Sequence, residues 1–115
     1  MTRMGLDQVV VDCSDAAALA RFWAALLGAE PVDRPSGWSH VEAEGWPRVA
    51  FQPVPEGKSV KNRLHFDVEV DDIGAATRRA LELGAVKRGE VQSDAEGRFQ
   101  VMLDPEGNEF CFVSD

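Results

Sequence analysis

The sequence predicts an α+β fold made of two similar βαβββ modules in one chain. Two strand-like segments, 8–15 and 65–72, place apolar residues at every second position, as a half-buried strand requires. Each segment leads into a stretch with apolar residues at helical spacing, and both stretches end in Leu-Gly-Ala, at 27–29 and 83–85. Short strand-like segments separated by turns follow each stretch, so the same order of elements occurs twice.

Local signals define the individual elements of this repeat. Ser and Asp at 14–15 and Asp at 71–72 are good N-cap residues for the two helices, and Gly28 and Gly84 are suited to end them. The turn 104–107, Asp-Pro-Glu-Gly, combines a proline that fixes φ with a glycine that allows positive φ. The remaining strands are expected at 30–33, 38–43, 48–53, 86–90, 98–103 and 108–113.

The length of 115 residues is that of one ordinary domain, so we expect a single domain over 1–115. Module 1 is expected at about 5–54 and module 2 at about 64–115, joined by a linker at 55–63 that is rich in Gly, Pro and charged residues. Each module is too small for a core of its own. We therefore expect the two modules to form a cupped mixed β-sheet with the helices on its outer face.

The composition disfavours several classes of function. Twenty acidic residues against twelve basic ones give a net charge of −8, so the chain should repel nucleic acids and anionic membrane surfaces. No apolar run approaches the roughly 20 residues of a membrane helix, and the first residues lack the apolar core of a signal peptide. The two cysteines, Cys13 and Cys111, are expected to be thiols. We therefore expect a cytoplasmic protein with neither nucleic acid nor membrane as a partner.

The repeat and its motifs resemble the vicinal oxygen chelate (VOC) superfamily, which includes glyoxalase I, extradiol dioxygenases, and fosfomycin and bleomycin resistance proteins. The matching stretches cover nearly the whole chain and lie at 19–23, 27–28, 63–68, 70–72 and 104–110. The last of them, Asp-Pro-Glu-Gly-Asn-Glu-Phe, is typical of the small glyoxalase-like branch. The resemblance implies the glyoxalase/bleomycin resistance/dihydroxybiphenyl dioxygenase fold, a small-molecule ligand and a homodimer.

Metal-dependent members of this superfamily hold a divalent ion in the cup with residues from the first and last strands of each module. Carried over by motif, these positions are Gln8, Gln52, His65 and Cys111. Strand alternation supports the transfer, because it turns Gln8, His65 and Cys111 to the open face and Cys13 toward the helices. The superfamily usually has His, Gln or Glu at these positions and ends with a Glu. With His65 as the one strong ligand, we expect no cofactor or a weakly bound divalent metal ion.

A small-molecule cup is predicted from Gln8, Trp38, Gln52, His65, Asp67 and Cys111. Trp38 would supply an aromatic wall, with hairpin packing or a dimer contact as the alternative. His65 is either a ligand or proton-transfer residue, or a cup histidine satisfied by its polar neighbours Asp67, Glu69 or Gln8. His40 faces either the cup or solvent. Cys111 is interpreted as a small buried side chain rather than a nucleophile, since no oxyanion-hole pattern accompanies it.

Two main functions fit this interpretation. The first is a glyoxalase-like small-molecule binding protein with a cup-shaped site and a weakened set of metal ligands. The alternative is a metal-dependent VOC enzyme, a lyase, isomerase or dioxygenase, that uses His65 as a ligand. An accessory domain with a vestigial cup is a third interpretation. The sequence does not identify the ligand. It also does not decide whether the cup forms within one chain or by exchange of modules between two chains. The metal content of the protein would distinguish the first two functions.

Overall fold

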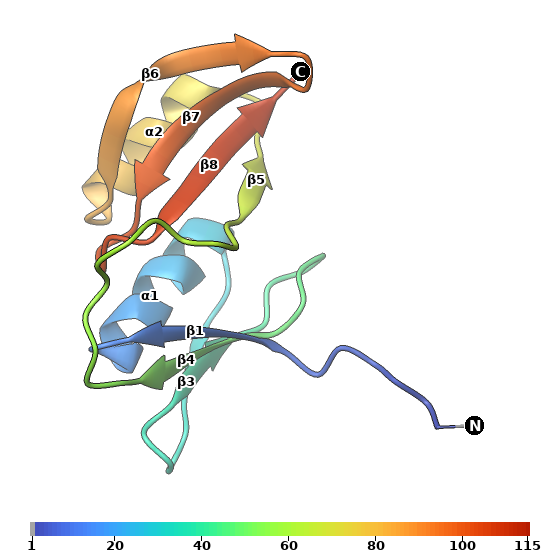
Figure 1. Cartoon of the computed structure of the whole chain (residues 1–115), viewed down its shortest axis with the longest axis vertical. Helices are drawn as coiled ribbons and strands as arrows, with labels where there is room; N and C mark the ends of the chain where they lie inside the picture. The colour runs from blue at the N-terminus through green and yellow to red at the C-terminus, as the bar shows by residue number, and fades with distance from the viewer. Residues whose placement is uncertain (1) are drawn as a thin grey trace. The chain divides into compact units, whose positions relative to one another are not determined.

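The computed structural model describes residues 2–115, and the chain divides into two compact units, Met1–Gly57 and Lys58–Asp115. We call these units module 1 and module 2. The division falls inside the linker expected at 55–63, and each unit contains one helix and four strands (Figure 1). The α+β class and the repeated βαβββ order predicted from the sequence are therefore confirmed. Within the described residues, neither helix is long and apolar enough to cross a membrane.

Module 1 is a four-stranded mixed sheet with its helix packed on one face. Its strand order is β1-β4-β3-β2, with β1 parallel to β4 and the other neighbours antiparallel. Helix α1 packs on β2, β3 and β4, and the strand residues that face it, among them Val41, Val49 and Phe51, are buried. The elements are β1 (Val9–Cys13), α1 (Ala16–Leu27), β2 (Pro31–Asp33), β3 (Ser39–Val41) and β4 (Val49–Pro53).

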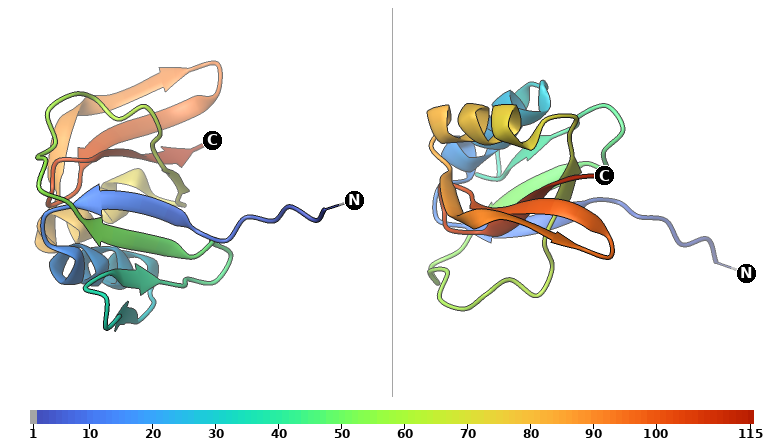
Figure 2. Two further views of the ribbon diagram at one scale, coloured as in Figure 1. Left: turned by 60° about the horizontal axis from the view of Figure 1, so that its bottom comes forward. Right: turned by 90° about the horizontal axis from the view of Figure 1, so that it is seen from above.

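Module 2 repeats this topology with a shorter first strand and longer second, third and fourth strands. Its strand order is β5-β8-β7-β6, again with the first strand parallel to the last. Helix α2 lies against β6, β7 and β8 on one face of the sheet (Figure 2). Phe110 and Phe112 are buried, and their rings meet edge to face with centroids 5.4 Å apart. The elements are β5 (Asp67–Glu69), α2 (Ile73–Glu82), β6 (Val86–Asp94), β7 (Gly97–Leu103) and β8 (Glu109–Ser114).

Aspartates begin both helices. Asp15 caps α1 by accepting a 3.0 Å hydrogen bond from the backbone N–H of Ala18, and Asp72 caps α2 in the same way from Ala75 at 3.0 Å. Gly28 ends α1 with φ 72°, a left-handed conformation that favours glycine. The capping residues thus fix the point at which the chain leaves the first strand of each module and enters its helix.

Strand β6 runs farther than the expected 86–90 and contains a bulge. Its pairing with β7 shifts in register between Arg88 and Gln92. Gln100 of β7 is 1% exposed, and its Nε2 donates hydrogen bonds to the carbonyl oxygens of Arg88 (3.3 Å) and Gly89 (3.1 Å). These bonds satisfy carbonyl groups at the bulge. The buried amide therefore allows β6 to continue past the irregularity.

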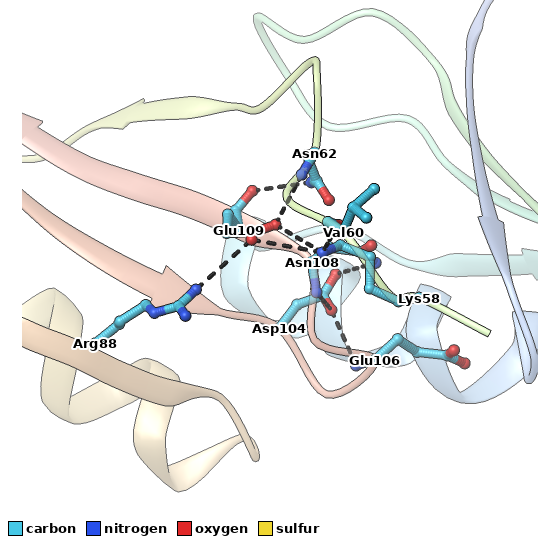
Figure 3. A network of polar contacts seen from close by, with 8 residues as sticks. All are labelled: Lys58, Val60, Asn62, Arg88, Asp104, Glu106, Asn108 and Glu109. Atoms are coloured by element: carbon cyan, nitrogen blue, oxygen red, sulfur yellow. Dashed lines mark hydrogen bonds and ion pairs between the residues drawn. The ribbon is translucent and has the colours of Figure 1, made fainter.

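A buried aspartate organises the turn between β7 and β8. Asp104 is 3% exposed, and its carboxylate accepts hydrogen bonds from the backbone N–H groups of Glu106 (2.9 Å) and Asn108 (3.0 Å) and from the Asn108 side chain (3.1 Å) (Figure 3). Gly107 closes the turn with φ 85°. The turn therefore fixes where β8 begins, and with it the face to which each side chain of β8 points.

A second buried carboxylate attaches the linker to module 2. Glu109 is 7% exposed; its Oε1 lies 3.1 Å from Nζ of Lys58 and accepts a 3.1 Å hydrogen bond from the backbone N–H of Asn62 (Figure 3). Nη1 of Arg88 lies 3.6 Å from Oε2, and Lys58 also donates to the carbonyl oxygen of Val60. Burial acts to raise the pKa of Glu109, but the hydrogen bonds from Asn62, from its own backbone and from Lys58 outweigh burial and lower this pKa. The linker segment is therefore held against β8 by an ionised carboxylate.

Replacing Glu109 by Gln should destabilise the protein in a pH-dependent way. Near neutral pH we expect the free energy of unfolding to fall by roughly 1–3 kcal/mol, because Lys58 and Arg88 lose their carboxylate partner. Folding lowers the pKa of Glu109 from its ordinary value of 4.5, so its stabilisation is complete above that value and is lost as the pH falls through the folded pKa. Urea denaturation should show that the difference in the free energy of unfolding between the wild type and Glu109→Gln becomes smaller below about pH 4.5.

The matched control is Glu96→Gln, which removes an exposed carboxylate from the same module. It should change the free energy of unfolding by less than about 0.5 kcal/mol throughout the pH series. If the difference in the free energy of unfolding between the wild type and Glu109→Gln stays constant down to about pH 3, the ion-pair role of Glu109 is contradicted.

Candidate functional site

The open face of the module 2 sheet is hollowed into a cavity of about 880 Å³. Side-chain alternation decides which residues reach it. Phe99, Val101 and Leu103 of β7 line the cavity, whereas Gln100 and Met102 between them are buried on the other side of the sheet. Residues from β5, β6, β8, the linker and two turns complete the lining, and several of them are charged. The cavity is therefore formed by one module, and its wall along β7 is largely apolar.

A polar cluster faces the same cavity from β5 and β8. Nε2 of His65 lies 3.2 Å from Oδ1 of Asp67, and Asp67 is paired in register with Cys111 on the parallel strand β8. One potential ligand atom from each of the three residues lies within 4.8 Å of the other two. The side chains of His65 and Asp67 are 42% and 57% exposed, so small molecules can reach both. The structure thus brings together three of the residues predicted to form a cup.

The thiol of Cys111 is not activated as a nucleophile. Burial raises its pKa above the usual value, and the carboxylate of Asp67 raises this pKa further, while Lys61 acts in the opposite direction. At neutral pH the raised pKa therefore favours the protonated thiol, which is a poor nucleophile. Both cysteines are free, and Cys13 is buried.

The remaining predicted cup residues lie on the open face of the module 1 sheet. Gln52 of β4 alternates with Phe51, which is buried on the side of α1, and Gln8 directly precedes β1. The register of β3 against β4 places His40 on the same side as Gln52, and Trp38, two residues earlier, shares that side. The sequence left the orientation of His40 open, and the strand register assigns it to the open face.

Two arginines converge on Gln8. Its side-chain oxygen Oε1 accepts hydrogen bonds from Nη2 of Arg34 at 2.9 Å and from Nε of Arg48 at 3.2 Å. The guanidinium group of Arg34 lies 5.6 Å from the centre of the Trp38 ring, close enough for a cation–π contact. Neither arginine was identified from the sequence. Arg48 directly precedes β4, and the alternation of side chains along that strand, extended by one residue, places it on the open face. Arg34 follows β2 in a turn, where no periodicity predicts the direction of its side chain.

His40 is held as a neutral imidazole beside these arginines. Nε of Arg34 donates a 2.8 Å hydrogen bond to Nδ1 of His40, so this nitrogen must be an acceptor. Burial lowers the pKa of His40, and the positive charge of Arg34 lowers it further, against the opposing effect of Glu42. The proton of the ring therefore lies on Nε2, which is 3.4 Å from Oε1 of Glu42.

Of the four positions carried over from metal-dependent relatives, Gln8 and Gln52 lie in module 1 and offer amide oxygens, whereas His65 and Cys111 lie in module 2. The oxygen of Gln8 already accepts hydrogen bonds from two guanidinium groups, whose charge would repel a cation, and Gln52 offers only a neutral amide. His65, Asp67 and Cys111 instead combine imidazole, carboxylate and thiol donors, a combination that suits zinc-like ions once the thiol loses its proton. A metal ion would therefore be held by the module 2 cluster.

Comparison with known protein families gives a match to the glyoxalase-like domain over residues 8–113. A sequence search of curated proteins finds no match. The family match begins just before β1 and ends within β8, so it includes the helix and strands of both modules.

Several solved structures share the fold at low sequence identity. A glyoxalase/bleomycin resistance protein/dioxygenase family enzyme from Burkholderia phytofirmans is 18% identical, with a TM-score of 0.77, covering 92% of this chain and 94% of that one. A fosfomycin resistance protein from Listeria monocytogenes, solved with Mn(II) and 1S,2S-dihydroxypropylphosphonic acid, is 15% identical, with a TM-score of 0.78 and coverage of 97% and 90%. The oxidase ChaP-H2 is 22% identical, with a TM-score of 0.74 and coverage of 99% and 95%.

At these identities the structural likeness shows the fold alone, and the family match carries the assignment. It confirms the family expected from the internal repeat and from the motif at 104–110. The chain therefore belongs to the glyoxalase-like domain family of the VOC superfamily.

Proposed function

We propose that this protein binds a small organic molecule in the cavity of module 2. The observation that carries the proposal is the combination, in a cavity of about 880 Å³, of an apolar wall on β7 with the polar cluster on β5 and β8. Ligand pockets commonly measure roughly 300–1,000 Å³ and have mainly apolar linings with a few polar groups. The apolar part of the ligand lies against Phe99 and Val101, and its polar group meets His65 and Asp67.

Two features favour binding over catalysis in this cavity. Cys111 keeps its proton at neutral pH, because burial and Asp67 raise its pKa. The carboxylate of Glu109, at the start of β8, also lines the cavity. It is paired with Lys58 and Asn62, and its lowered pKa makes it a weak base. A fosfomycin resistance protein of the same fold holds a small organic acid, which supports a small-molecule ligand for this fold.

A charge placed on the apolar wall should block this binding. Val101→Glu should weaken the binding of aromatic and aliphatic fragments at least about tenfold, because the new carboxylate resists desolvation. Two-dimensional NMR titration of the wild type should show saturable shifts of backbone amides in β7 and β8. Val10→Glu is the matched control, since it places the same charge on an exposed position of module 1, and it should keep the affinities within about twofold. A fragment library that leaves the wild-type β7 and β8 amides unshifted would refute the proposal.

A metal-dependent VOC enzyme is the second candidate, and the compact grouping of His65, Asp67 and Cys111 favours it. These residues would hold the ion, which supplies a Lewis acid for a lyase, isomerase or dioxygenase reaction. An ion bound here would displace the proton of Cys111 and compete with the 3.2 Å contact between His65 and Asp67, which lowers its affinity without preventing binding. We therefore place this candidate second.

Metal analysis separates the two candidates. We expect purified protein, incubated with Zn²⁺ or Mn²⁺ and then desalted, to retain well under one ion per chain by elemental analysis, because the ion must displace the thiol proton and compete with the contact between His65 and Asp67. The pair His65→Ala and His40→Ala tests the ligands, since His40 lies outside the cluster. Stoichiometric metal lost only in His65→Ala would establish the metalloenzyme candidate instead, and stoichiometric metal retained in both variants would remove His65 from the ligand set.

We also infer a cytoplasmic homodimer with two-fold symmetry. Each sheet has two edge strands, β1 and β2 in module 1 and β5 and β6 in module 2, and natural proteins generally cover such edges. Val32 on β2 and Val86 on β6 are exposed apolar residues on edge strands. Light scattering should give twice the mass of the chain. A monomeric mass at micromolar concentration and above would count against the dimer.

A further inference from the structure

The two arginines on the open face of module 1 are the strongest feature that the proposed function leaves unexplained. Arg34 and Arg48 are both half-buried, and both donate to the single neutral oxygen Oε1 of Gln8. Sharing one acceptor brings two positive charges close together, where they repel each other. A neutral amide oxygen does not neutralise that charge, so the arrangement is suited to a negatively charged partner.

Within residues 2–115, carboxylates neutralise this pair in part, at Arg48 and not at Arg34. Among residues 2–115, no carboxylate forms an ion pair with Arg34, although the chain carries twenty acidic residues. Arg48 pairs with Asp7, at 3.1 Å between Nη2 and Oδ1, and the Asp7 side chain is 82% exposed on the segment before β1. Nη1 of each arginine makes no hydrogen bond within the same residues. Each guanidinium group therefore keeps N–H donors for a ligand.

The polar groups around the pair are donors as well. The oxygen of Gln8 is directed to the two arginines, so its amide NH₂ group is the end left for other partners. His40 accepts from Arg34 at Nδ1 and carries its proton on Nε2. Arg34, Arg48 and the amide of Gln8 thus present N–H donors, while the proton on His40 already faces Glu42 at 3.4 Å. N–H donors of this kind select a ligand rich in acceptors. Carboxylate and phosphate oxygens are such acceptors, whereas neutral amides and alcohols also carry donors.

We propose that Arg34 and Arg48, placed around Gln8, form a binding site for the oxyanion of a small carboxylate or phosphate ligand. Asp7 occupies part of this site as an internal carboxylate, and an incoming anion displaces it from Arg48. The site uses residues of module 1 alone, so it goes beyond the cavity of module 2 and does not depend on it. Trp38, which lies against Arg34, gives the ligand an aromatic neighbour.

The test follows the arginine side chains directly in the full-length protein by ¹⁵N NMR. Sodium benzoate, sodium phosphate and the neutral analogue benzamide are titrated at constant ionic strength. We expect saturable shifts of the Nε–H signals of Arg34 and Arg48 with benzoate or phosphate, and none with benzamide. Tighter binding of benzoate identifies a carboxylate ligand, and tighter binding of phosphate identifies a phosphate ligand. Shifts that stay linear with both anions would overturn the site, whatever happens at the β7 and β8 amides of module 2.

Variants then separate specific binding from general charge. Arg34→Gln and Arg48→Gln should each weaken anion binding about tenfold, the loss expected for one charged hydrogen bond. Arg21→Gln removes one exposed positive charge from the same module and should leave the affinity within about twofold. Asp7→Asn should tighten binding several-fold, because it removes the internal competitor. An equal loss in Arg21→Gln, or weaker binding in Asp7→Asn, would overturn the proposal; circular dichroism of each variant verifies the fold.

Discussion

Each module has one helix, and one helix can cover only one face of a four-stranded sheet. This constraint assigns a role to every residue of the strands, because successive side chains point to opposite faces. The helix-covered face takes the large apolar side chains, such as Phe51 in module 1 and Phe112 in module 2, which are at most 1% exposed. Most of the charged side chains of the strands are left to the opposite face, whereas Gln100 is a polar exception buried on the helix side. The candidate sites of both modules follow from this division.

The two modules have kept this constraint while their chemistry has diverged. Asp12 lies beside Gln52 in module 1, whereas Asp67 lies beside Cys111 in module 2. In the internal repeat, segment 8–15 aligns with 65–72, so Asp12 corresponds to Glu69, and segment 51–54 aligns with 110–113, so Gln52 corresponds to Cys111. Relative to this alignment, the strand pairing of the two modules differs by two residues. A two-residue step keeps every side chain on its own face, while a single-residue step would reverse all of them. The open faces of the two modules therefore remain comparable but carry different side chains. Module 1 has an arginine pair there, and module 2 has an imidazole–carboxylate–thiol cluster.

Periodicity explains what the sequence predicted and what it missed. Alternation was enough to place His65 and Cys111 on one face and to bury Cys13, and the helix caps followed from local residue preference. The contacts that cross between elements had no such signal. Nothing local in the sequence indicates that Asn62 and Lys58 of the linker bind Glu109, or that a turn residue reaches Gln8. Such contacts depend on the direction in which the chain leaves each turn, and this direction cannot be predicted from any single segment.

The same contacts limit what chemistry module 2 can perform. An acid–base catalyst works best with a pKa near the working pH, yet the pKa of Glu109 is lowered and that of Cys111 is raised, so both groups move away from neutrality. His65 is the other titratable group of the cluster that could transfer a proton, and its partner Asp67 can orient it. Because His65 is 42% exposed, water surrounds it until a ligand covers the cavity. Catalysis at this site would therefore require prior binding of a ligand that excludes water from His65.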